Sequence, residues 1–209
     1  IKKCTKAIQK HRPSTMLDEC YFLIGQAYFY KNDYFNAQET FQYTFLEYKG
    51  DPKPLAAYRA EIWLGWAYAS EGNYDKAKAV LSNIKSQEEF PKDLRKERLV
   101  FETELEIHQD NYEIAAELLR EAIELERKRE KKTRMIYVLD QLYQNLGENG
   151  KAAVRYREVI KRNPEYEMAF NAKMSLAQNF KEGTVSSEEI KKILLRMLKD
   201  DKNLDYVDR

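Results

Sequence analysis

The sequence predicts an all-α protein built from repeated pairs of antiparallel helices, and three observations support this. The stretch "GQAYFYKNDYFNA" at Gly25–Ala37 returns 40 residues later as "GWAYASEGNYDKA" at Gly65–Ala77, with Gly, Ala, Tyr, Tyr and Ala in the same places. Charged residues make up 34% of the chain, while Gly and Pro number only seven and five, a composition typical of helices with solvated faces. The apolar residues within a repeat also recur at helical spacing, as in Ala37, Phe41, Phe45 and Tyr48.

A small residue marks the same point in four successive repeats. It closes the motifs "DYFNA", "NYDKA", "NYEIA" and "ENGKA", at intervals of 40, 38 and 37 residues, at Ala37, Ala77, Ala115 and Ala152. Each repeat is predicted to have a first helix, a short turn, and a second helix that begins near this motif. The prolines fall between the repeats, where a missing amide hydrogen costs no helical hydrogen bond, at Pro13, Pro52, Pro54, Pro91 and Pro164.

The two ends of the chain also fit the repeat. "CTKAIQKHRPS" near the start resembles "YREVIKRNPEY" at 156–166, so residues 1–11 are predicted to be a second helix whose first helix is missing. Near the other end, "AFNAKMSLAQNF" is predicted to be a first helix and "SSEEIKKILLRMLKD" a second, with Ser186 or Ser187 as its N-cap. We therefore expect residues 1–209 to form a single array of about five helical hairpins, the first truncated, within a larger protein.

The glycines and alanines of the repeat are predicted to be contact positions. Gly25 and Gly65 lie within the predicted first helices, where Gly is about 1 kcal/mol less favourable than Ala, so we expect close approach of the paired helix there. The motif alanines are small for the same reason, while Tyr28, Tyr68 and Tyr143 are predicted to fill the space between helices.

These positions resemble the tetratricopeptide repeat, a pattern of about 34 residues. One copy matches it at Tyr21, Ile24, Gly25, Tyr28, Ala37 and Phe41. The next copy matches it at Leu64, Gly65, Tyr68, Ala77, Leu81 and Ile84. Later copies depart from it, with Thr103 and Asp140 where the family has Gly. The resemblance implies an α-solenoid, a right-handed superhelix of antiparallel helix pairs whose first helices line a concave groove.

The family register predicts which residues line that groove and bind a protein or peptide partner. These are Phe22, Gln26, Phe29, Tyr30, Arg59, Trp66 and Tyr137. Aromatic anchors beside Gln and Arg are typical of surfaces that bind peptides or helices. The alternative is that these rings lie in the hydrophobic core or are covered by further repeats upstream.

The sequence offers little for catalysis, a metal or a cofactor, so we expect a protein that is not an enzyme. The chain has two histidines, His11 and His108, too far apart in a repeat array to act together, and no phosphate-binding, zinc-protease or hydrolase motif. Cys4 and Cys20 match no metal-binding spacing. They are expected to be buried thiols, and a disulfide between them would require an oxidising compartment and adjacent helix faces.

Charge argues against a nucleic-acid or membrane-surface partner. The 36 basic and 35 acidic residues nearly cancel, and no apolar run approaches the roughly 20 residues that span a bilayer. The strongest basic cluster, Arg127–Arg134, is interrupted by Glu130 and has no aromatic residues within it. We expect it to be a solvated turn, with phosphate contact as the alternative.

Two segments carry a closer resemblance: "NPEYEMAFNAKMSLAQNF" at 163–180 and "LLRMLKDDKNLDYVDR" at 194–209. They resemble the SprE/PorW family of tetratricopeptide lipoproteins of gliding motility and type IX protein secretion, although "KDDKN" departs from the family pattern. The resemblance implies a periplasmic, outer-membrane-associated protein, held by a lipid anchor outside this segment, that docks other secretion components without enzymatic activity or cofactor. It would place the cysteines in an oxidising compartment. A peptide- or ligand-sensing regulator, or a cytoplasmic location, is the alternative.

Overall fold

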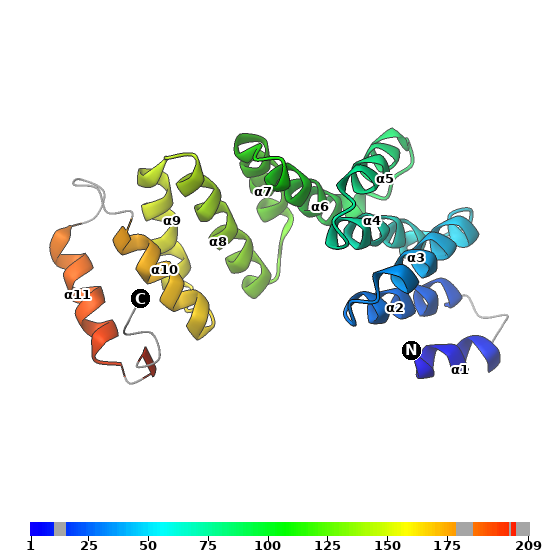
Figure 1. The fold of residues 1–209 in the computed structure, drawn as a ribbon, viewed down its shortest axis with the longest axis horizontal. Helices are drawn as coiled ribbons and strands as arrows, with labels where there is room; N and C mark the ends of the chain where they lie inside the picture. The colour runs from blue at the N-terminus through cyan, green and yellow to red at the C-terminus, as the bar shows by residue number, and fades with distance from the viewer. Residues whose placement is uncertain (11–15, 179–185, 201, 204–209) are drawn as a thin grey trace. The chain divides into compact units, whose positions relative to one another are not determined.

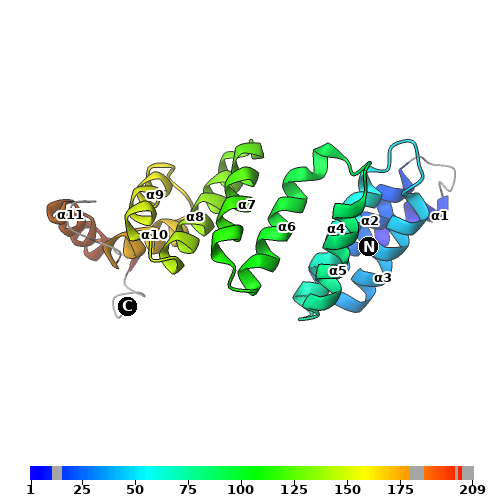
Figure 2. The same ribbon diagram turned by 90° about the horizontal axis from the view of Figure 1, so that it is seen from above.

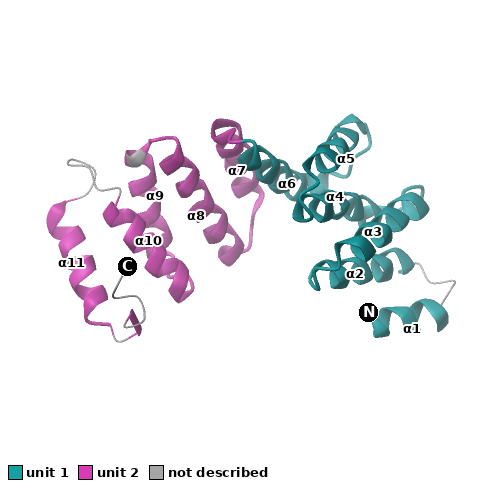
Figure 3. Cartoon of the chain, in the orientation of Figure 1, with its two compact units in different colours: residues 1–109 teal, residues 110–209 magenta. Residues whose placement is uncertain are grey.

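The computed structural model describes residues 1–10, 16–178, 186–200 and 202–203. These residues form two compact units, which meet in sequence between Gln109 and Asp110 (Figure 3). Pro13 and His11 lie outside the described residues. Every regular element in the described ranges is helical and none is a strand, which confirms the predicted all-α fold class. The single array over residues 1–209 stays a prediction.

The described residues of unit 1 form six α-helices and one short 3-10 helix (Figure 1). Their bounds are α1 Lys2–Lys10, α2 Leu17–Phe29, α3 Tyr34–Tyr48, α4 Leu55–Ser70, α5 Tyr74–Ser86, η1 Lys92–Leu94 and α6 Arg95–His108. Each helix packs on the next, and the first helices of successive hairpins also contact one another, α2 with α4 and α4 with α6. Figure 2 shows the hairpins α2–α3 and α4–α5 next to each other in this unit.

In unit 2, outside residues 179–185, 201 and 204–209, the structure shows five α-helices, and consecutive helices pack against each other from α7 to α11. Their bounds are α7 Tyr112–Leu125, α8 Arg129–Asn145, α9 Asn149–Lys161, α10 Tyr166–Gln178 and α11 Ser187–Leu198. Ser186 is the N-cap of α11, because its side chain accepts a hydrogen bond of 3.1 Å from the backbone N–H of Glu189. The predicted cap is thereby confirmed. None of the described helices is both long and apolar enough to span a bilayer.

Four turns between consecutive helices share one backbone conformation. The fifth residue before each motif alanine has a positive φ, between 59° and 86°, at Asn32, Gly72, Asp110 and Gly147. Asn, Asp and Gly are the residues that tolerate this left-handed conformation. In three of these turns, the backbone N–H of the residue after the positive-φ residue donates a hydrogen bond to the carbonyl of a Tyr in the last turn of the preceding helix. These tyrosines are Tyr28, Tyr68 and Tyr143.

The packing at the helix glycines confirms close approach at both, but with different partners. A Cβ on Gly25 would lie 2.5 Å from Cε1 of Phe41, on the paired helix α3 as predicted. A Cβ on Gly65 would overlap the ring of Phe101, which belongs to α6 and not to the paired helix α5. The expectation of a paired-helix contact at Gly65 was therefore wrong: its bare backbone makes room for a ring of the following repeat. The motif alanines are all fully buried, as expected.

Candidate functional site

Unit 1 contains a cluster of aromatic rings around Trp63 of α4. We call Phe29, Tyr30, Trp63 and Trp66 the aromatic cluster. The Trp63 ring lies 5.3 Å from the ring of Phe29, 5.8 Å from that of Tyr30 and 5.3 Å from that of Trp66, all three edge to face. This arrangement places the positive edge of one ring against the negative face of another and fixes the orientation of each.

The cluster is held to α6 by hydrogen bonds to one carboxylate. Trp63 donates its indole N–H to Oε1 of Glu97 over 2.8 Å, and Arg59 donates its Nε–H to Oε2 over 3.1 Å. The Arg59 guanidinium also lies over the ring of Phe22, 5.7 Å from its centroid. Because a guanidinium and an indole N–H share this carboxylate, Trp63 keeps a defined orientation between α2, α4 and α6.

One predicted groove residue does not lie on an open surface. The side chain of Phe22 is 3% exposed and packs against Phe41 and Trp63, with ring centroids 6.0 and 5.9 Å away. The prediction that Phe22 contacts a partner was wrong, because its ring faces α3 and the underside of Trp63. It supports the aromatic cluster from within the core.

The other predicted residues of unit 1 remain accessible to different degrees. Tyr30 is 72% exposed, at the end of α2. Gln26, Phe29, Arg59 and Trp66 are half-buried. Trp66 lies between Trp63 and Phe101, at ring distances of 5.3 and 5.8 Å, so its inner part joins the core. No bound partner tests these residues, and their role in binding stays a prediction.

Tyr137 lies in unit 2 and is not part of the aromatic cluster. Its ring is half-buried on α8 and lies 6.0 Å from the ring of Tyr156 of α9. Burial, together with the nearby carboxyls of Asp140 and Glu167, raises the pKa of Tyr137. Whether it shares a binding surface with the residues of unit 1 stays a prediction.

Trp63 was missed by the sequence reasoning, which assigned the inward face of α4 from the family register. Trp63 was not among the predicted groove residues, yet it joins the aromatic cluster, while its neighbour Ile62 is fully buried. The available signal was that the two tryptophans of the chain stand three residues apart, which places them on one face of a helix.

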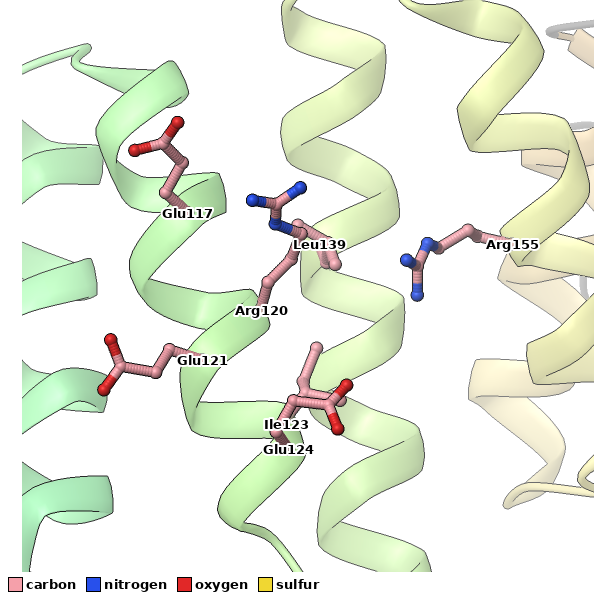
Figure 4. Close-up of a pocket in the computed structure, with 7 residues that line it drawn as sticks. All are labelled: Glu117, Arg120, Glu121, Ile123, Glu124, Leu139 and Arg155. Carbon is pink, nitrogen blue, oxygen red and sulfur yellow. The ribbon is translucent and has the colours of Figure 1, made fainter.

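A second feature, in unit 2, is a hollow of about 640 Å³ between α7, α8 and α9. Arg120 of α7 and Arg155 of α9 extend toward α8, where Leu139 lies between them (Figure 4). Beside Leu139, Asp140 is fully buried, and neither of its carboxyl oxygens has a hydrogen-bond partner among the described residues. Burial raises the pKa of Asp140 to about 8, against the opposing pull of the Arg155 charge. The carboxyl is therefore mostly protonated at neutral pH.

The basic segment at the start of α8 lines another hollow of unit 2, of about 530 Å³. Its lining includes Arg129, Lys131, Arg134 and Arg162, together with Glu130 and Glu165. Arg129 is used within the protein, because it donates from Nη2 to the backbone carbonyl of Arg162 over 2.7 Å. This agrees with a structural and solvated role for part of the cluster.

The described residues contain no group of three or more His, Cys, Asp or Glu side chains arranged to hold a metal ion. Cys4 of α1 and Cys20 of α2 are free thiols and are half-buried, where burial was expected. Burial and the adjacent Cys4 thiol, which hydrogen-bonds Cys20, raise the pKa of Cys20. The two helix faces are therefore adjacent, which was one of the two conditions for a disulfide.

Comparison with known proteins identifies the repeat. Models of the tetratricopeptide repeat match residues 18–42 and 59–89. These ranges contain most of α2 and α4, the first part of α3 and all of α5. A search of curated proteins gave no match. A crystal structure of MamA protein is similar with a TM-score of 0.62 and 21% identity, over 94% of this chain and 98% of that chain. A second crystal structure of MamA gives the same TM-score and identity over 88% and 98% of the two chains.

At this level of identity the likeness to MamA shows the fold alone. The two model matches show tetratricopeptide repeats at residues 18–42 and 59–89, within an all-α fold. Such repeats suggest a scaffold for protein–protein interaction.

Proposed function

We propose that this chain is a protein-interaction scaffold and that the aromatic cluster of unit 1 is its principal docking surface. The observation that carries the proposal is the position of Trp63. Its ring packs on the buried ring of Phe22 and its indole N–H donates to Glu97, while the ring of Tyr30 beside it is largely exposed. A partner peptide or helix would bury an apolar side chain against these rings.

The rigidity of the rings favours binding. Large side chains that are already ordered lose little conformational entropy when a partner docks, and Trp and Tyr are common anchors for that reason. Edge-to-face contacts hold Tyr30 to Phe29 and Trp63, at ring distances of 5.7 and 5.8 Å. Tyr30 thus combines high exposure with a defined orientation.

Site-specific photo-crosslinking tests this proposal. A benzophenone amino acid at Tyr30 should cross-link a discrete partner in cells, whereas the same group at Phe35 should not. Phe35 is a matched control, because it is an aromatic residue of the same unit that is 68% exposed on α3. Equal cross-linking from both positions, or from neither, would contradict the proposal.

The partner found in this way should then bind the purified chain directly. Tyr30→Ala is expected to weaken that binding at least tenfold, a typical loss for an interface anchor, while Phe35→Ala leaves it unchanged. Circular dichroism would confirm that both variants keep their helices. An unchanged affinity of Tyr30→Ala would exclude this surface as the docking site.

We further propose that the chain serves type IX secretion and gliding motility as part of a periplasmic lipoprotein associated with the outer membrane. This proposal rests on the sequence of the segments 163–180 and 194–209, which resemble the SprE/PorW family. Their described parts include α10 and the C-terminal end of α11. The proposed partners are other secretion components, with no nucleic acid and with membrane contact only through a lipid anchor outside this chain.

Cell fractionation tests the location separately from the docking surface. The protein should be found with outer membranes, resist extraction by salt and be released by detergent, and its deletion should abolish secretion of type IX substrates. Recovery in the cytoplasmic fraction, or normal secretion in its absence, would refute this part while leaving the scaffold proposal intact.

A further inference from the structure

One cation, the Arg59 guanidinium, is already held beside the aromatic cluster by a combination of three groups. Arg59 lies over the ring of Phe22 and pairs with Glu97, and the same carboxylate accepts the indole N–H of Trp63. The elements of this arrangement are an indole on α4, a carboxylate on α6 that accepts from it, and a guanidinium that pairs with the carboxylate beside an aromatic ring. Each group satisfies another, so this set is complete.

A second set on the same two helices lacks one of these elements. Trp66 follows Trp63 by three residues on α4, and its side chain lies within hydrogen-bonding reach of Glu104 on α6. Glu104 is exposed, and no Lys or Arg among the described residues forms an ion pair with it. Arg59 stands four residues before Trp63, but the corresponding residue before Trp66 is Ile62, which is apolar and fully buried.

We propose that an arginine or lysine side chain of the partner polypeptide completes this second set, with its cation next to the Trp66 ring and paired with Glu104. The inference rests on the proposed function, since it names the chemistry of the segment that docks on the aromatic cluster. The apolar residues flanking that cation contact Phe29, Tyr30 and Trp63. The recognised segment is thus basic and apolar.

The charges on this face favour a cationic occupant. Arg59 and Glu97 neutralise each other, while Glu104 has no ion-pair partner among the described residues. Burial raises the pKa of Glu104 against the opposing effect of the Trp66 hydrogen bond, so a cation placed beside it would favour the ionised carboxylate. An aromatic ring attracts a cation through its quadrupole, and a guanidinium can stack on the ring while it donates hydrogen bonds to a carboxylate. An acidic segment would meet repulsion from Glu104 and would gain no favourable contact from the ring face.

Tryptophan fluorescence, excited at a wavelength that tyrosine does not absorb, reports on this site alone, because Trp63 and Trp66 are the two tryptophans of the chain. The full chain would be titrated with three blocked heptapeptides of sequence Gly-Leu-Ser-X-Leu-Ser-Gly, in which X is Arg, Gln or Glu. We expect a saturable fluorescence change with the Arg peptide, and an affinity for the Gln and Glu peptides that is lower by about tenfold.

The variant Glu104→Gln should lower the affinity for the Arg peptide to that for the Gln peptide and leave the latter unchanged. The matched control Glu88→Gln removes an exposed carboxylate of the same unit that lies after α5, and should change neither affinity. Circular dichroism would confirm that both variants keep their helices. The affinities of the Arg and Gln peptides for wild type and for Glu104→Gln form a double-mutant cycle. This cycle separates the interaction of the cation with Glu104 from the apolar part of binding.

Three results would overturn the inference: equal affinity for the Arg and Gln peptides, no fluorescence change with the Arg peptide at millimolar concentration, or an Arg-peptide affinity that Glu104→Gln does not alter. Failure of this inference can be distinguished from failure of the proposed function. If Tyr30→Ala abolishes binding of the native partner while the Arg and Gln peptides bind alike, the docking surface stands and only its preference for a cation is wrong.

Discussion

The buried carboxyl of Asp140 gives the sharpest test of the structure. Asp140 occupies the position at which the repeat has Gly, and its side chain is fully buried in unit 2 with both oxygens unpartnered among the described residues. Asp140→Asn keeps the shape of the side chain and removes its ability to ionise. The change therefore isolates the cost of placing a charge at this position.

The sign and size of the effect follow from the pKa of Asp140. Burial raises it to about 8, from an ordinary value of 3.8, so the folded state binds the proton more tightly than the unfolded state. The free energy of unfolding is then highest below pH 4 and declines as the pH rises toward 8. Each pH unit within this window costs about 1.4 kcal/mol, so the loss from pH 5 to pH 7 is about 3 kcal/mol.

The assay is urea unfolding of the full chain at pH 5, 6 and 7. Hydrogen exchange in peptides from α8 to α10 monitors the unfolding of unit 2. Titration of other groups is common to both proteins, so the difference between wild type and Asp140→Asn reports on Asp140. The variant should gain about 3 kcal/mol relative to wild type between pH 5 and pH 7. Glu113→Gln, which changes an exposed carboxylate of α7, should follow the wild-type curve. Parallel curves for wild type and Asp140→Asn would refute the reasoning.

Three further outcomes are expected. Gly65→Ala should destabilise the protein by about 1–3 kcal/mol, because its Cβ overlaps the Phe101 ring, and Phe101→Leu in the same chain should recover part of the loss; a melting temperature unchanged by Gly65→Ala would contradict the contact. Oxidised glutathione should form a disulfide between Cys4 and Cys20, which removes two hydrogens from the intact mass and raises the free energy of unfolding by about 3 kcal/mol. Two thiols that can still be alkylated after the treatment would contradict this. Ser186→Ala should cost about 1 kcal/mol, seen as faster exchange of the first amides of α11, whereas unchanged exchange would show that the cap adds little.

Much of the fold could be predicted because the features that define the repeat depend on residues close together in the sequence. The positions of the turns follow from residues that tolerate a positive φ, and the motif alanines are buried wherever the spacing places them. Pro52, Pro91 and Pro164 lie between helices as expected, since a proline inside a helix would break its hydrogen bonds. Each of these features depends on a few neighbouring residues.

The candidate site could be predicted only in part, because it depends on helix rotation. A shift of one residue turns a side chain by about 100° around a helix, enough to exchange a core position for a surface one. That is why Ile62 is buried and Trp63 joins the aromatic cluster. Tyr30 remained on the surface because it follows the last turn of α2, where few neighbours can cover it.

The sequence by itself determined the helices, their turns and the small contact residues, because spacing and backbone preference act over short distances along the chain. The tertiary structure alone decided which rings face solvent, that Phe101 fills the space above Gly65, and that Glu97 orients Trp63. These contacts join residues more than 30 positions apart. They depend on the size and rotamer of side chains in the neighbouring repeat, and a local pattern carries no information about either.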